Sequence, residues 1–141
     1  MKRIFWLLLL LFTSCEQEKV DLPNVEDCDH YYYEDCNTQE PFESGVRFDF
    51  SINRQTHFVV FEVYKGTVDE GSLFFTDTAF DASVTYIMPV NEYYSAIATY
   101  QVDGKTIKVI DGGNLVKQGK TVCDSTCWGV NELVLDLSIR Q

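Results

Sequence analysis

Four cysteines are the residues best placed to do chemistry in this chain: Cys28, Cys36, Cys123 and Cys127. Thiols in such a set either bind a metal ion or pair as disulfides. A structural zinc site usually joins two close cysteine pairs, and the C-x7-C spacing of the first two does not fit that pattern. We therefore expect two disulfides and no metal site.

The pairing of these cysteines has three possible connectivities, which sequence cannot separate. Local pairing would close short loops, each contributing roughly 2–2.6 kcal/mol in the chain-entropy treatment, against about 4.7 kcal/mol for a link across some 95 residues. Crossed pairing would stabilise more, but local pairing forms more easily. We favour Cys28–Cys36 and Cys123–Cys127.

Catalysis finds little support in the residue types. Nucleophilic catalysis needs a base beside the nucleophile, and the only histidines are His30 and His57, which we interpret as solvated side chains. A Gly-x-Ser-x-Gly elbow is missing from the sequence. Carboxylates are abundant, but a glycosidase pair also needs a cleft that a bare sandwich of this size seldom supplies. We expect no enzyme activity and no cofactor.

The acidic loops are the remaining candidates for metal chemistry. Val68-Asp69-Glu70-Gly71 and Asp77-Thr78-Ala79-Phe80-Asp81 could offer oxygen ligands to calcium, but neither matches the EF-hand pattern. We interpret both as hydrated turns. The net charge of the whole chain is −11, which argues against nucleic acid as a partner because phosphate binding needs clustered Lys and Arg.

Three consecutive tyrosines, Tyr31, Tyr32 and Tyr33, form the candidate recognition feature. Tyrosine buries apolar area while it keeps a polar tip, so the three rings could stack on sugars or contact a protein groove. The alternative is that they pack back onto the folded domain and pin the segment that carries them.

The elements that must position these residues are strands. Val46, Phe48 and Phe50 alternate with polar residues, which predicts a first strand at an edge of the core with one face wet. The apolar run Phe58 to Tyr64 predicts a central strand covered more on both sides. The last strand should carry Leu133, Leu135, Leu137 and Ile139 inward.

Turn residues divide the rest of the chain. Ser72–Thr76 and Val84–Met88 are predicted as short strands, and 93–102 as the longest, with Tyr94 where a tyrosine corner would lie. Asp103-Gly104 predicts a two-residue hairpin, Asp111-Gly112-Gly113 a further turn, and the segment Cys123 to Cys127 a tight loop. Seven to eight short strands indicate a single antiparallel β-sandwich, immunoglobulin-like or transthyretin-like.

The N-terminal residues have the pattern of an export signal. Lys2 and Arg3 precede the apolar stretch 4–12, which is too short to span a bilayer, since spanning takes about 20 residues. Thr13 and Ser14 then lead into Cys15, and Phe12-Thr13-Ser14-Cys15 resembles the bacterial lipobox, although Phe12 replaces the usual leucine. The resemblance implies cleavage before Cys15 and lipid attachment, including palmitate, to that cysteine.

Three segments follow from this interpretation: a signal peptide over 1–14, a lipidated acidic tether with a cysteine-closed loop over 15–44, and the β-sandwich over 45–141. Loss of Lys2 and Arg3 with the signal takes the net charge from −11 to −13. The acidic residues after Cys15 resemble the surface-export signals of Bacteroidetes-type lipoproteins. We expect an outer-membrane protein of a Gram-negative cell, facing the outside.

Several pieces of the mature chain resemble uncharacterised Bacteroidetes-type outer-membrane lipoproteins with an immunoglobulin- or transthyretin-like β-sandwich. The pieces are Tyr64-Lys65-Gly66, Met88-Pro89-Val90-Asn91, Tyr93-Tyr94-Ser95-Ala96, Ala98-Thr99-Tyr100, Val109-Ile110-Asp111-Gly112 and Cys123-Asp124-Ser125-Thr126-Cys127-Trp128. The resemblance implies fold and location, and brings no catalytic motif. The expected function is a membrane-anchored, non-catalytic module for protein interaction or envelope assembly, with carbohydrate binding as the alternative.

Overall fold

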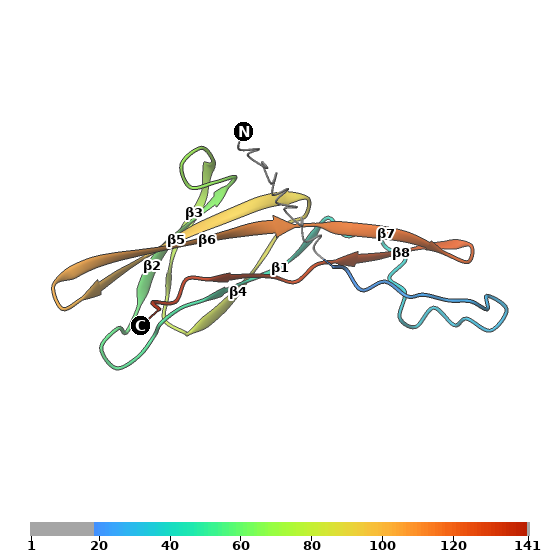
Figure 1. The fold of residues 1–141 in the computed structure, drawn as a ribbon, viewed down its shortest axis with the longest axis horizontal. Helices are drawn as coiled ribbons and strands as arrows, with labels where there is room; N and C mark the ends of the chain where they lie inside the picture. Colours follow the sequence, from blue (N-terminus) through green and yellow to red (C-terminus); the bar gives the residue numbers. More distant parts are fainter. Residues whose placement is uncertain (1–18, 141) are drawn as a thin grey trace, which may run out of the picture.

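Nine β-strands and no helix make up residues 19–140, the part of the chain that this computed structural model describes. In chain order they are β1 (Glu43–Asp49), β2 (Val59–Lys65), β3 (Ser72–Ala79), β4 (Ser83–Pro89), β5 (Glu92–Val102), β6 (Lys105–Leu115), β7 (Lys117–Val122), β8 (Ser125–Val130) and β9 (Leu133–Asp136). Seven strands form two sheets, ordered β4-β1-β9 and β3-β2-β5-β6, and β7 pairs with β8 in a separate ribbon (Figure 1). The predicted all-β sandwich is confirmed.

The strand order corrects the expected place of β1. β1 pairs antiparallel with β4 and parallel with β9, so it is the middle strand of its sheet and not an edge. β1 and β2 lie in different sheets. This order does not distinguish the immunoglobulin-like from the transthyretin-like design, because an immunoglobulin domain also divides its strands between two sheets.

The core lies between the two sheets and comes from the inward positions of alternating strands. Ten residues expected in the core are at most 6% exposed: Phe48, Phe50, Phe61, Val63, Tyr94, Ala96, Ala98, Leu133, Leu135 and Leu137. Ile139, which the alternation also places inside, is only partly buried. Aromatic rings from both sheets meet there, with the Phe48 and Phe61 centroids 5.6 Å apart. The core prediction is confirmed.

Strand β2 is central, as predicted, because it pairs with β3 on one side and β5 on the other. The expected cover on both of its faces is wrong. Val59, Phe61 and Val63 are fully buried, whereas the outward Val60 is 41% exposed. The apolar run therefore buries only one face, and its outward residues lie at the surface.

The Asp103-Gly104 hairpin is confirmed. Both residues have the positive φ that such a turn needs, 50° and 74°, and Val102 pairs with Lys105 across it. This turn sets the register of β5 and β6 along eleven residue pairs.

The turn predicted at Asp111-Gly112-Gly113 is wrong, because β6 continues through it to Leu115. The glycines serve close packing instead. A β-carbon on Gly113 would lie 2.7 Å from Leu133 Cδ1, so only glycine lets β9 approach β6 there.

Two buried tyrosines link the strands to the segments around them. The Tyr94 hydroxyl donates to the Pro89 carbonyl at 2.8 Å, a contact a few residues upstream as in a tyrosine corner. The Tyr100 hydroxyl donates to the Leu137 carbonyl at 2.7 Å and accepts from the Ser51 amide at 3.1 Å. These bonds satisfy the buried hydroxyls and fix the chain after β1 and after β9.

Candidate functional site in a disulfide-stapled arm

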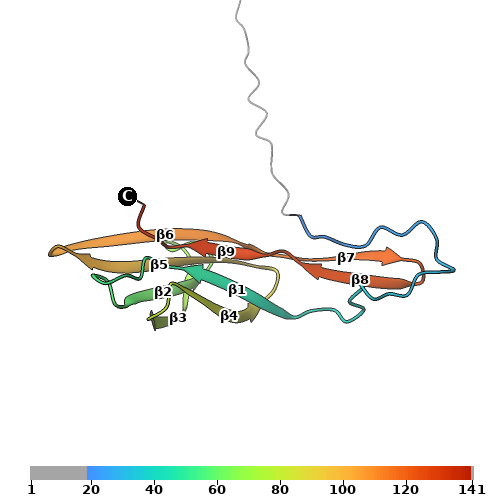
Figure 2. The same ribbon diagram turned by 90° about the horizontal axis from the view of Figure 1, so that it is seen from below.

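A long arm projects from one end of the sandwich (Figures 1 and 2). It consists of the β7–β8 ribbon together with residues 19–42, which run beside the ribbon; we call residues 19–42 and 117–130 the arm. β6 leads into β7 and β8 leads back to β9, so the ribbon extends a connection between two sandwich strands. The alternation of side chains along the sequence does not predict this arm.

The disulfides cross between the two parts of the arm. Cys28 bonds Cys123 and Cys36 bonds Cys127, with α-carbon separations of 5.6 and 5.0 Å. The prediction of two disulfides is confirmed, but the local pairing, the cysteine-closed loop and the tight loop between Cys123 and Cys127 are wrong.

The physical reason for the crossed pairing is the hairpin turn. Cys123, with φ 55°, lies in the turn, whereas Cys127 lies in β8, where its cross-strand neighbour is Lys120. Extended chain rises about 3.3 Å per residue, and a disulfide needs α-carbons within about 7 Å. The strand thus separates the two cysteines, and each bonds a cysteine from residues 19–42 instead.

Polar contacts hold residues 19–42 against the ribbon along its length. The Trp128 amide donates to the Asn37 carbonyl at 2.8 Å, within an isolated bridge between these residues. Lys117 Nζ lies 2.6 Å from a Glu40 carboxylate oxygen, and Lys120 Nζ donates to Asn24 Oδ1 at 3.1 Å. Residues 19–42 therefore pack on the ribbon both before and after the loop that carries the tyrosines.

Two glycines of the ribbon make this packing close. A β-carbon on Gly129 would lie 2.4 Å from Val20 Cγ1, and one on Gly119 would lie 2.8 Å from the Trp128 ring. Val20 is thus fixed beside β8, and the indole lies across β7. Two glycines and a tryptophan, Gly119, Gly129 and Trp128, were the sequence signal that could have indicated this ribbon, in which Gly119 lies opposite Trp128.

The three tyrosines lie in the loop between Cys28 and Cys36. The Tyr31 and Tyr33 rings contact each other with centroids 4.5 Å apart, and the Tyr31 hydroxyl donates to Asp35 Oδ1 at 2.6 Å. Desolvation and this hydrogen bond raise the pKa of Tyr31 to about 12. Tyr32 is 82% exposed, so it does not pack back onto the sandwich.

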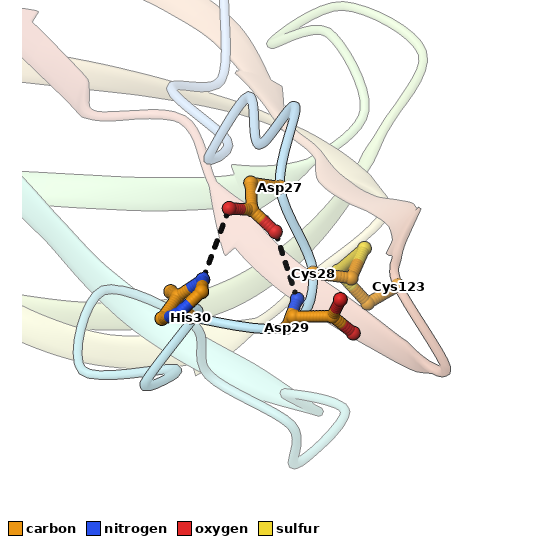
Figure 3. The surroundings of a disulfide bond; sticks show 5 residues. All are labelled: Asp27, Cys28, Asp29, His30 and Cys123. Atoms are coloured by element: carbon orange, nitrogen blue, oxygen red, sulfur yellow. Dashed lines mark hydrogen bonds and ion pairs between the residues drawn. A yellow bond between two sulfur atoms is a disulfide. The ribbon is translucent and has the colours of Figure 1, made fainter.

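Acidic residues surround the disulfide near the loop. Asp27 Oδ2 lies 3.1 Å from His30 Nδ1, and Asp27 Oδ1 accepts the Asp29 amide at 3.0 Å, beside the Cys28–Cys123 bond (Figure 3). The His30 side chain is 80% exposed, in line with its interpretation as a solvated residue. Among residues 19–140 no group of three or more His, Cys, Asp or Glu side chains could hold a metal ion.

The interpretation of residues 77–81 as a hydrated turn is wrong for its first three residues, because β3 continues to Ala79. Asp77 accepts a hydrogen bond from the Tyr86 hydroxyl and one from the Thr78 amide, and these bonds lower the pKa of its carboxyl group. Burial and the same bond raise the pKa of Tyr86 to about 12. The Asp77 carboxylate therefore links β3, an edge strand of one sheet, to β4, an edge strand of the other.

Hollows lie on the surface of the sandwich. One of about 340 Å³ is lined by residues that include His57, Phe58 and Thr99, and one of about 590 Å³ by residues that include Lys65 and Tyr93. Glutamine and threonine are the other polar side chains beside His57, so no carboxylate orients its ring there.

Comparisons with known protein families, with curated proteins and with solved structures found no match. Within residues 19–140, no helix has the length and apolar character needed to cross a membrane. Cys15, the predicted lipid site, lies outside the described residues.

Proposed function

We propose that this protein is a lipid-anchored, non-catalytic protein of the bacterial outer surface, which makes protein contacts through the tip of its arm. The observation that carries the proposal is the stapling of residues 19–42 to the ribbon immediately after the lipobox-like Cys15. A module that acted as a bare sandwich on a long tether would have no need of this arm.

The arm shortens the distance between the anchor and the folded chain. Val20 packs against Gly129, and it lies only five positions after Cys15 in the sequence. At most about 3.6 Å per residue, the lipid lies within about 18 Å of Val20. The anchor therefore holds the base of the arm beside the membrane, and β7, with six residues, carries the tip about 20 Å further.

The tip has the character of a recognition loop. Among residues 19–140, Tyr32 is the most exposed of the large apolar side chains, and its neighbours Tyr31 and Tyr33 are held by their mutual ring contact. The flanking disulfides restrict the loop, which lowers the entropy lost on binding. Aromatic side chains on such preorganised loops contribute most of the energy in many protein interfaces.

The anchor is tested in the native host. Wild-type protein should incorporate labelled palmitate and resist extraction by salt, whereas Cys15→Ala should incorporate none and leave the membrane fraction. Mass spectrometry of the mature wild type should place the lipid on an N-terminal Cys15. Equal labelling of both proteins would contradict the anchor.

Surface location and reach form a separate prediction. On intact cells, external protease should cleave a site inserted at the Asp103-Gly104 turn, which lies in a sandwich hairpin. A fluorophore at residue 118, on β7 near Val130, should transfer energy to membrane dye more efficiently than one at residue 104. Equal transfer from both positions would contradict an anchor close to the base of the arm.

Carbohydrate binding is the second candidate, favoured by the exposed Tyr32 ring next to a pair of tyrosines. A glycan array separates the two functions. A sugar-binding tip should give signal that falls at least about tenfold in Tyr32→Ala and stays unchanged in Tyr93→Ala, a sandwich tyrosine that is 37% exposed. A protein-contact module should give no glycan signal and should crosslink to an envelope protein from position 32 and not from 93.

A further inference from the structure

Four strands end the two sandwich sheets: β4, β9, β3 and β6. Unpaired edges expose rows of backbone donors and acceptors, so proteins usually protect them. The protection in this chain is uneven within residues 19–140. Three edges are covered or distorted, and one is not.

The β6 and β9 edges close on each other. The Asp136 amide donates to Asp111 Oδ2 at 2.8 Å, so a side chain of β6 takes the place of a strand partner for β9. Leu133 packs directly over Gly113 along the same seam. Over residues 111–113 of β6 these two edges are therefore covered from within the protein, and Lys105 and Lys108 place charges along the rest of β6.

The β3 edge is distorted by a bulge. Val63 pairs with Phe75 and Tyr64 with Leu73, which leaves Phe74 as an extra residue on β3. The Phe74 ring lies 5.0 Å from Lys65 Nζ and 6.1 Å from the Tyr94 ring centre. A bulge of this kind bends an edge away from a straight partner strand.

The β4 edge has neither a bulge nor a strand beside it within residues 19–140. Tyr86 on its inward face donates its hydroxyl to Asp77 of β3, a side-chain contact that does not use the backbone groups of the edge. β4 pairs with β1 over all seven residues without a register shift, and its sequence Ser-Val-Thr-Tyr-Ile-Met-Pro contains no charge. Proline stands only at its last position, and Ile87 is 64% exposed. This edge is straight, uncharged and accessible.

The hydrogen bonds at both ends of the ladder define which backbone groups face outward. The Phe50 amide donates to the Ala82 carbonyl at 2.8 Å, and the Val90 amide donates to the Phe42 carbonyl at 3.0 Å. Because bonded pairs alternate in antiparallel sheets, even-numbered residues of β4 bond to β1. The amides and carbonyls of Ser83, Thr85 and Ile87 therefore point to the open edge.

The charges beside this edge indicate what would cover it. Asp81 lies two residues before the Ser83 end, and Glu43 lies opposite Pro89 at the other end. Arg47, opposite Thr85, is already paired with Asp49 and Glu132. A second copy of this acidic chain would bring like charges together, whereas a strand with basic ends would be attracted.

We propose that β4 receives an extended segment of a partner protein as an added strand, bonded to Ser83, Thr85 and Ile87 and carrying Lys or Arg at its ends. Strand addition takes affinity from main-chain bonds and specificity from alternate side chains. The surface lies on the sandwich and does not involve the arm. Strand addition at β4 is therefore independent of the proposed recognition by Tyr32.

The test uses a synthetic peptide with a seven-residue core of alternating Val and Thr between paired lysines. In the protein alone, the Thr85 and Ile87 amides should exchange with solvent rapidly. The peptide should slow hydrogen exchange at both amides by at least about tenfold. It should not slow exchange at the Lys108 or Ile110 amides, which lie in β6, an edge strand of the other sheet. A peptide with glutamates in place of the lysines should bind at least about tenfold more weakly.

Two variants at one position isolate the backbone bond. Thr85→Pro removes an outward amide and leaves the bonds to β1, a substitution that edge strands tolerate, and should weaken peptide binding about tenfold. Thr85→Val keeps the amide and should bind within about twofold of wild type. Tyr32→Ala should have no effect.

Four results would overturn the proposal. Slow exchange of the Thr85 and Ile87 amides in the monomeric protein would mean that the edge is already covered. Concentration-dependent protection with dimer formation would make the occupant a second copy. Binding that Thr85→Pro leaves unchanged, or no binding of the lysine peptide, would remove strand addition at β4.

Discussion

Removing both disulfides should destabilise the protein by about 7–8 kcal/mol, whereas removing either one alone should cost only about 3 kcal/mol. The inequality follows from the crossed pairing. With one link intact, the second closes a ring of about a dozen residues, but the last remaining link closes a loop across 91 or 95 positions. Urea denaturation of Cys28→Ala/Cys123→Ala, of Cys36→Ala/Cys127→Ala and of the variant that combines them measures the three values.

Local pairing would give a different result, with two costs of roughly 2–2.6 kcal/mol that add. Tryptic mapping without reduction provides the direct control. Residues 20–47 and 121–140 are each free of internal Lys and Arg, so crossed bonds should join them in one species. Two separate peptides, each with an internal disulfide, would contradict the structure. Cleavage before Asp124 and Asp35 then distinguishes the two crossed arrangements.

Leu135→Asp should abolish folding. Leu135 is fully buried in β9 opposite Phe48, and no cation lies in the core to pair with a new carboxylate. An unpaired buried charge costs several kcal/mol, comparable with the total stability of a domain of this size. We expect the loss of the cooperative thermal transition and of the dispersed NMR spectrum of the wild type.

Val134→Asp is the matched control for this prediction. Val134 is the next residue of the same strand, partly exposed and paired in register with Arg47. An aspartate there faces outward beside a guanidinium, so the free energy of unfolding should change by less than about 1 kcal/mol. Similar behaviour of the two variants would contradict the assigned faces of β9.

The elements that sequence alone predicted are those governed by short-range physics. Alternation in β1 and β9 identified Val46, Phe48, Leu133 and Leu135 as core residues, because side chains in a strand point to opposite faces in turn. Asp103-Gly104 identified the β5–β6 turn because few residue pairs adopt two positive φ angles. In both cases neighbouring residues carry the whole signal.

The elements that sequence missed depend on contacts between distant segments. The glycines at 112 and 113 predicted a turn, but their role is set by Tyr93 and Leu133, which approach them across the fold. The loop predicted between Cys123 and Cys127 is a turn followed by a strand, because residues 19–42 supply the ribbon with its disulfide partners. The local conformational preferences of residues 112–113 and 123–127 allow either a turn or a strand.

The candidate sites divide in the same way. Sequence determined the lipobox-like Cys15, the run of three tyrosines and the composition of β4, since each is a property of adjacent residues. Only the tertiary structure decided that the tyrosines stand on a stapled arm and that β4 lacks a neighbour on one side. Disulfide pairing and sheet edges are set by which distant segments fold side by side, and the free energy of those contacts is not carried by any single stretch of sequence.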